Sequence, residues 1–183
     1  MRCFGTGDPL YEAYHDEEWG VPPRHSPDER ELFERVSLEA FQSGLAWITI
    51  LRKREGFRGA FDGFDPEVVA GYGADDVDRL MADPGIVRNR AKIEATIRNA
   101  RALNAMHGAD EGLADVFAAH APPPRERRVP TIRDLPGRTA ESTALAKDLK
   151  RRGFAFVGPT TAYAAMQALG YVDDHVEGCL VAS

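Results

Sequence analysis

Two histidines and two cysteines of the chain could bind one metal ion. His175 and Cys179 are four residues apart, and residues with this spacing share one face of a helix. Cys3 and His15 form a second Cys-His pair near the other end of the sequence. Because zinc binds about four nitrogen or sulfur ligands in a tetrahedron, the two pairs together would form a complete site that joins the termini. The alternatives are a disulfide between Cys3 and Cys179, or two unrelated thiols with two surface histidines.

Glu39 is a carboxylate on an otherwise apolar helix face. It follows Leu32 by seven residues and therefore projects within about 20° of it on a helix of ~3.6 residues per turn. An unpaired carboxylate is seldom buried, because its desolvation costs on the order of several kcal/mol. Either the helix is exposed at Glu39, or this side chain faces a polar cavity as a functional group.

Three aromatic residues, Tyr11, Tyr14 and Trp19, lie in an acidic segment from Asp8 to Pro23. Tyr11 and Tyr14 are three residues apart, so both rings face one side of a helical turn. Such aromatics commonly cover the edge of a core. They could also line a pocket for a flat ring, because an aromatic face stacks on any base.

Glycines bracket a short loop near the C-terminus. Gly153 follows the basic helical run from Lys147 to Arg152, where a C-terminal cap is expected, and Gly158-Pro159 opens another helix. Between them, Phe154, Phe156 and Val157 are apolar enough to hold the loop against a core. The free N–H groups at the start of the second helix would suit a phosphate. The loop is therefore read as a helix-hairpin-helix, with an ordinary αα-hairpin as the alternative.

The composition is that of an ordinary globular protein. The 183 residues suffice for one well-buried core, and we expect a single domain over 1–183. A net charge of -6 argues against non-specific coating of nucleic acid. Three basic runs, at 52–54, 88–98 and 147–152, could still share one face. Neither a membrane span nor a signal-peptide core is recognisable, so we expect a cytoplasmic location.

Helix signals follow one another along the chain, and strand signals are absent, so an all-α fold is expected. Ser26-Pro27 is predicted to start the helix that carries Glu39, and Gly44 to end it before another begins at Trp47. Further helices are predicted after Asp65-Pro66, at Asp75-Asp76, from Ile86 to Met106, and from Thr139 to Gly153. Within 109–137 the stretch APPPRERRVP, residues 121–130, is expected to be a proline-rich, basic connector that crosses the surface.

Four segments resemble, in this order and over almost the whole chain, 3-methyladenine DNA glycosylase I, an all-helical family of the helix-hairpin-helix DNA glycosylases. They are CFGTGDPLYEAYHDEEWG, LEAFQSGLAWITILRKRE, GIVRNRAKIEATIRNA and RRGFAFVGPTTAYAAMQALGYVDDHVEGC. The resemblance implies a repair enzyme that hydrolyses the N-glycosidic bond of 3-methyladenine in alkylated double-stranded DNA and leaves an abasic site. It also implies a monomer whose hairpin occupies about 140–170. A non-catalytic protein that binds alkylated DNA is the alternative.

The resemblance also implies roles for individual residues. Glu39 and Tyr14 would be catalytic, and Trp47, Tyr11, Trp19 and Phe4 would contact the base. Gly44 and Leu45 would probe the space left by the extruded base, and Gly153, Phe154, Val157, Gly158 and Thr160 would belong to the phosphate-binding hairpin. Cys3, His15, His175 and Cys179 would hold one structural zinc ion, which clamps 3–15 to 175–179.

The sequence departs from the family at two positions. Phe4 follows Cys3 directly, where members commonly carry a tryptophan slightly later. Asp173 stands where many members have asparagine, and the related endonuclease III type carries its catalytic aspartate at this place in the motif V-D-x-H-V. Asp173 is therefore a candidate second carboxylate, or alternatively the N-cap of a helix over 174–179.

Overall fold

The computed structural model describes residues 1–21 and 28–181, and the elements within them are helices joined by turns and loops. The α-helices are α1 (Pro9–Glu17), α2 (Glu29–Gln42), α3 (Trp47–Ala60), α4 (Pro66–Ala70), α5 (Ala74–Ala82), α6 (Arg90–His107), α7 (Leu113–Ala119), α8 (Ala140–Arg151) and α9 (Pro159–Ala168), with 3₁₀ turns η1 (Asp62–Phe64) and η2 (Ile132–Asp134). The expected all-α fold is confirmed. No helix in these ranges is long and apolar enough to cross a bilayer.

Helix boundaries follow local capping chemistry. Asp65 caps α4 with Pro66 at its first position, and Thr139 caps α8, both as predicted. The prediction that Ser26-Pro27 starts α2 falls outside the described residues, and the observed N-cap is Asp28. The long helix begins at Arg90 rather than Ile86, because the Asn89 side chain accepts the Lys92 N–H and caps it there.

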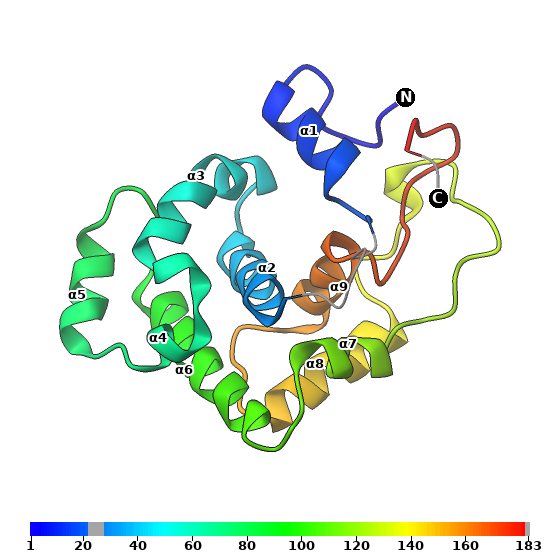
Figure 1. Ribbon diagram of the computed structural model, residues 1–183. Helices are drawn as coiled ribbons and strands as arrows, with labels where there is room; N and C mark the ends of the chain where they lie inside the picture. The colour runs from blue at the N-terminus through cyan, green and yellow to red at the C-terminus, as the bar shows by residue number, and fades with distance from the viewer. Residues whose placement is uncertain (22–27, 182–183) are drawn as a thin grey trace.

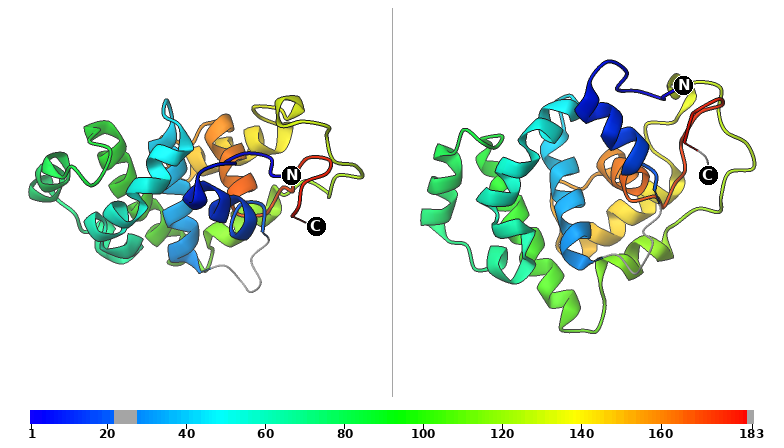
Figure 2. Two further views of the ribbon diagram at one scale, coloured as in Figure 1. Left: turned by 90° about the horizontal axis from the view of Figure 1, so that it is seen from above. Right: turned by 45° about the horizontal axis from the view of Figure 1, so that its top comes forward.

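Helix α2 is the centre of the molecule. Figure 1 shows it between α3–α6 on one side and α7–α9 with the chain ends on the other, and the views of Figure 2 agree. Every residue from Leu32 to Phe41 is buried, and one apolar cluster extends from α2 through α3–α9. A second, smaller aromatic cluster joins α1 to the beginning of α3 and the end of α9.

Helices α8 and α9 form the hairpin that the glycines predicted. The Phe154 N–H donates to the Leu149 carbonyl and the Gly153 N–H to the Lys150 carbonyl, which is the Schellman arrangement. Gly153 has a φ of 106°, a conformation that favours glycine. Phe154 and Val157 are buried, but Phe156 is 48% exposed, so the expectation that it pins the loop is wrong.

The two ends of the chain lie side by side. The Leu180 N–H donates to the Met1 carbonyl, and the Met1 amino group donates to the Gly178 carbonyl. The N–O distance is 2.8 Å in both hydrogen bonds. Residues 171–181 form turns rather than the helix expected over 174–179. His175 and Cys179 therefore approach each other through a turn, in which the Cys179 N–H donates to the Val176 carbonyl.

Candidate functional site

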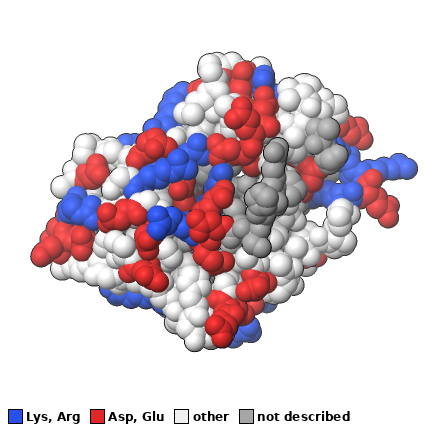
Figure 3. All heavy atoms as spheres, in the orientation of Figure 1, with Lys and Arg blue, Asp and Glu red and all other residues white. Residues whose placement is uncertain are grey.

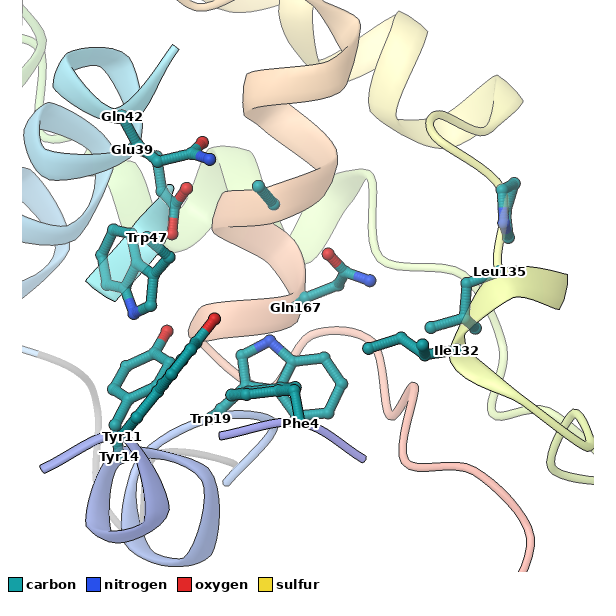
Figure 4. A pocket seen from close by; sticks show the side chains of 12 residues that line it. Phe4, Tyr11, Tyr14, Trp19, Glu39, Gln42, Trp47, Ile132, Leu135 and Gln167 are labelled. Carbon is teal, nitrogen blue, oxygen red and sulfur yellow. The ribbon is translucent and has the colours of Figure 1, made fainter. Parts of the chain in front are cut away.

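A pocket of about 300 Å³ opens between α1, α2, α3, η2 and α9. It is lined by Phe4, Tyr11, Tyr14, Trp19, Glu39, Gln42, Trp47, Ile132, Leu135, Pro136, Ala164 and Gln167, and Figure 4 shows most of these side chains. All six residues to which the resemblance assigned catalysis or base contact thus border one cavity. Its size and aromatic lining suit a single flat ring.

Aromatic rings form one wall of this pocket. The Phe4 ring lies 4.9 Å from Tyr11 and 5.0 Å from Trp19, centroid to centroid, and Tyr14 lies 5.2 Å from Trp47. Such separations are typical of favourable aromatic pairs. Phe4 therefore belongs to the aromatic wall of the pocket.

Glu39 supplies the pocket with a buried carboxyl group. It is 5% exposed, and its side chain forms no hydrogen bond within the ranges described. Burial raises the pKa of Glu39 to about 8, although the Arg35 guanidinium acts to lower it. The charge of this carboxyl group therefore depends on what occupies the pocket.

Arginines secure the α1 end of the pocket to its neighbours. Arg35 of α2 and Arg54 of α3 both bind the Glu18 carboxylate, with shortest N–O separations of 2.6 Å. The Arg35 guanidinium also lies 5.9 Å from the centre of the Tyr14 ring. Because these pairs are partly buried and share Glu18, they fix α1 against α2 and α3.

The turn between α2 and α3 forms an exposed tip beside the pocket. Gly44 has a φ of 87°, and Leu45 is 38% exposed. Gln42, which lines the pocket, donates to the Leu45 carbonyl. The buried Lys92 ammonium donates to the carbonyls of Phe41 and Ser43, with an N–O distance of 2.8 Å in both hydrogen bonds. The tip is thus held firmly while its end remains free to contact a ligand.

The hairpin is joined to the pocket through α9. Gly158 and Thr160 are exposed at the start of this helix, whereas Ala164 and Gln167 line the pocket further along. Asn99 of α6 holds the loop by two hydrogen bonds, one to the Ala155 N–H and one to its carbonyl. A ligand bound at the hairpin would therefore lie in fixed register with the pocket.

Several of these polar residues are not recognisable as site residues from the sequence. Lys92 and Asn99 act through contacts to distant parts of the chain, which composition and periodicity do not reveal. Gln42 and Gln167 have partners three and seven residues away, and it is their place in the pocket lining that the sequence pattern does not show. A weak signal existed for Lys92 and Asn99, since each lies on the otherwise apolar face of α6. For Gln42 and Gln167 we find no such signal.

The Cys-His cluster has the geometry of a metal site. The ligand atoms of Cys3, His15, His175 and Cys179 all lie within 4.8 Å of one another. The sulfur of Cys179 is 3.5 Å from His15 Nε2 and 3.4 Å from His175 Nδ1. Tetrahedral zinc with ordinary bond lengths separates sulfur and nitrogen ligands by about 3.6 Å. Both cysteines are free thiols, so the disulfide alternative is wrong.

Neighbouring oxygen atoms orient both histidines of the cluster. His15 Nδ1 lies 2.8 Å from the Asp16 carboxylate, and His175 Nε2 lies 3.1 Å from the Trp19 carbonyl. Each contact makes that nitrogen the N–H donor, so the opposite nitrogen offers its lone pair to the cluster. The residues therefore fit a metal ion, and the ion would support the wall formed by Phe4 and Trp19.

Asp173 lies outside the pocket lining. Its carboxylate accepts from the His175 N–H and pairs with Arg128 at 3.2 Å. Since the residues that follow form turns, the N-cap interpretation is wrong in its original form. Instead, the hydrogen bond from the His175 N–H to the Asp173 carboxylate stabilises a local turn, and this turn directs His175 toward the Cys-His cluster.

The basic runs do not form one uniform surface. Arg52 pairs with Asp8 and Arg90 with Asp78, and Lys92 is buried. On the face drawn in Figure 3, acidic and basic side chains are interleaved. The exposed Lys147 and Lys150, close to the hairpin, remain available for an anion.

Enzymes that act on an extruded base bind it in a pocket with aromatic walls, and the all-α fold with a glycine-containing hairpin beside such a pocket is what the resemblance to the helix-hairpin-helix DNA glycosylases implied. Comparison with known proteins makes the class more specific. Residues 4–182 match the family model described as methyladenine glycosylase, and the chain belongs to this family.

Relatives and solved structures agree. The chain is 49% identical to DNA-3-methyladenine glycosylase 1 of Escherichia coli K12, over 97% of this chain and 95% of the relative. It is 46% identical to DNA-3-methyladenine glycosylase of Haemophilus influenzae, over 97% and 96%. A crystal structure of 3-methyladenine DNA glycosylase I superposes with a TM-score of 0.92 at 48% identity, covering 98% of each chain. A tyrosine-to-phenylalanine variant of such an enzyme, solved with 3-methyladenine, gives 0.89 at 36% identity, over 97% and 95%.

Proposed function

We propose that this protein is a DNA-3-methyladenine glycosylase of base excision repair. It hydrolyses the N-glycosidic bond of 3-methyladenine in alkylated duplex DNA and leaves an abasic site. The observation that carries this proposal is the buried Glu39 carboxyl group, which stands among Tyr11, Tyr14 and Trp47 in a pocket sized for one base.

Charge distinguishes the lesion from normal adenine. An adenine methylated at N3 in DNA is cationic, so its glycosidic bond is already weakened and the leaving base needs no proton. A cation gains about 0.5–2 kcal/mol from aromatic faces compared with a neutral ring. It also favours the ionised form of Glu39, whose carboxylate then accepts a hydrogen bond from the base. Neutral adenine gains less from both contacts.

Two exposed segments of the protein contact the DNA. The Gly44-Leu45 tip occupies the space that the extruded base leaves, which offsets part of the few kcal/mol that extrusion costs. The exposed start of α9, with Gly158 and Thr160, binds a backbone phosphate through free N–H groups. Lys147 and Lys150 add positive charge near that phosphate.

Zinc is the metal we propose for the cluster, one ion per chain. Cys3, His15, His175 and Cys179 would hold it, and two sulfur and two nitrogen ligands complete a closed, structural coordination shell. When bound, the ion supplies a rigid link between the two chain ends.

An abasic-site assay tests the proposed function. Duplex DNA treated with a methylating agent is incubated with the protein, and released bases and alkali-labile sites are measured. We expect free 3-methyladenine and intact abasic strands before alkali treatment, because no lysine of the hairpin stands where a lyase nucleophile is expected. Binding to methylated DNA without release of a base would instead support the non-catalytic alternative. Action as a monomer in the cytoplasm stays a prediction.

A further inference from the structure

Asp174 is a buried carboxylate that the proposed function does not use. It is 1% exposed. Its Oδ2 accepts from the Tyr163 hydroxyl at 2.5 Å and from Gln167 Nε2 at 2.7 Å, while Oδ1 forms an ion pair with Arg125 at 3.0 Å. Both partners beside Gln167, the Tyr163 hydroxyl and the Arg125 guanidinium, present donors to Asp174, so its carboxyl oxygens act as acceptors and the nitrogen of the Gln167 amide faces them.

This contact fixes which atom Gln167 presents to the pocket. Gln167 lines the cavity from α9, opposite the α2 side that carries Glu39. In the view of Figure 4 its amide oxygen lies on the side of Glu39, and its nitrogen on the other side. Within the described ranges Oε1 accepts no hydrogen bond, so it is available to a ligand.

We propose that Gln167 is a specificity-determining residue, whose amide oxygen accepts a hydrogen bond from the exocyclic amine of adenine and repels a purine that carries oxygen at that position. Asp174 is its positioning residue, because it prevents the amide from turning over. This inference rests on the proposed function and adds a determinant of base identity to it.

Glu39 alone could not make this distinction. A carboxyl group accepts a hydrogen bond when it is ionised but donates one when it is protonated, so it can satisfy either an amine or a carbonyl oxygen. The Gln167 amide does not titrate, and Asp174 holds its oxygen toward the cavity. The exocyclic amine of adenine has two hydrogens, one for each wall of the pocket.

Binding of free bases tests the proposal without requiring catalysis. The probes are 3-methyladenine and 3-methylhypoxanthine, which has the same ring system with oxygen in place of the amine, and binding is followed by quenching of tryptophan fluorescence. Gln167→Met keeps the side-chain length but removes the amide. We expect it to lower the ratio of the two affinities about tenfold, mainly through weaker binding of 3-methyladenine. Unchanged affinity for 3-methyladenine, or equal loss for both bases, would overturn the proposal.

A second variant tests the positioning role. Asp174→Asn introduces an amide that can donate to Gln167 and so allows the Gln167 amide to turn over. The ratio of the affinities for 3-methyladenine and 3-methylhypoxanthine should therefore fall. The zinc content, which reports the integrity of the adjacent His175, should stay near one ion per chain. An unchanged ratio contradicts this role of Asp174. The wild-type release assay separates the two proposals: release of 3-methyladenine with an unaltered ratio in Gln167→Met refutes only the inference, whereas absence of release refutes the function itself.

Discussion

At Glu39, a helix buries a carboxyl group without giving it a hydrogen-bond partner among the described residues. Such an arrangement costs stability, and sites that bind or transform a ligand commonly contain it. The Arg35 guanidinium acts to lower the pKa of Glu39, but it is itself bound to Glu18. A cationic base in the pocket can therefore supply the positive charge and the hydrogen-bond donor that the Glu39 carboxylate lacks.

Replacing this carboxyl group should impair excision. We expect Glu39→Gln to lower kcat/KM for release of 3-methyladenine by roughly 10- to 100-fold, the range that loss of a ~1.5–3 kcal/mol hydrogen bond to a charged group produces. Glu31→Gln is a matched control, because Glu31 is exposed on the same helix. Equal activity of Glu39→Gln and the control would show that the carboxylate is not used.

The same carboxyl group should make stability depend on pH. Its pKa is raised from 4.5 to about 8, so between these values the folded protein holds a proton that the unfolded chain has lost, and stability falls as pH rises. Glu39→Gln lacks this titration. Between pH 5 and pH 8.5 we expect the wild type to lose roughly 2–4 kcal/mol of unfolding free energy relative to the variant, measured by urea unfolding at both pH values. A difference that stays constant with pH would contradict the burial of an unpaired carboxyl.

Among the elements, the junction of α2 and α3 depends on Lys92. Its ammonium satisfies two carbonyls at the end of α2, and Met can replace only the apolar part of the side chain. We expect Lys92→Met to lower the free energy of unfolding by about 1–3 kcal/mol and to weaken binding to duplex DNA. Arg90→Met removes the same charge from an exposed position of α6 and should cost less than about 1 kcal/mol. If the two variants behave alike, Lys92 does not support the tip.

Local chemistry explains which elements could be predicted from the sequence. Asp65-Pro66, Thr139 and Gly158-Pro159 specify helix starts through their own side chains and rings, and the structure confirms them. The prediction of a helix over 174–179 is wrong. The four-residue spacing of His175 and Cys179 also fits a turn that brings the two side chains together.

Long-range contacts explain the rest. The resemblance placed Glu39, Tyr14 and Trp47 at one site, and the structure brings them to one cavity. Periodicity alone left the direction of Glu39 open. The partners of Lys92 and Asn99 come from distant segments, and no local pattern in the sequence encodes them.

At the scale of the whole molecule, the Cys-His cluster joins the two ends of a chain whose main core lies elsewhere. Main-chain hydrogen bonds between Met1, Gly178 and Leu180 assist it, and Phe4 and Trp19 of the pocket pack beside its histidines. Loss of the metal should therefore affect the aromatic wall before it affects α6, which is buried in the main core.

Metal removal tests this order. We expect purified protein to contain about one zinc per chain, and chelation to lower the free energy of unfolding by about 3 kcal/mol or more, since a ligand at a hundredfold excess over its Kd already contributes ~2.7 kcal/mol. Amide exchange should accelerate in residues 1–20 and 171–181 while α6 stays protected. Cys179→Ser should reproduce the change, and added zinc should reverse it only in the wild type. Uniform acceleration of exchange across α6 and the termini would show that the cluster supports the whole core rather than the base pocket.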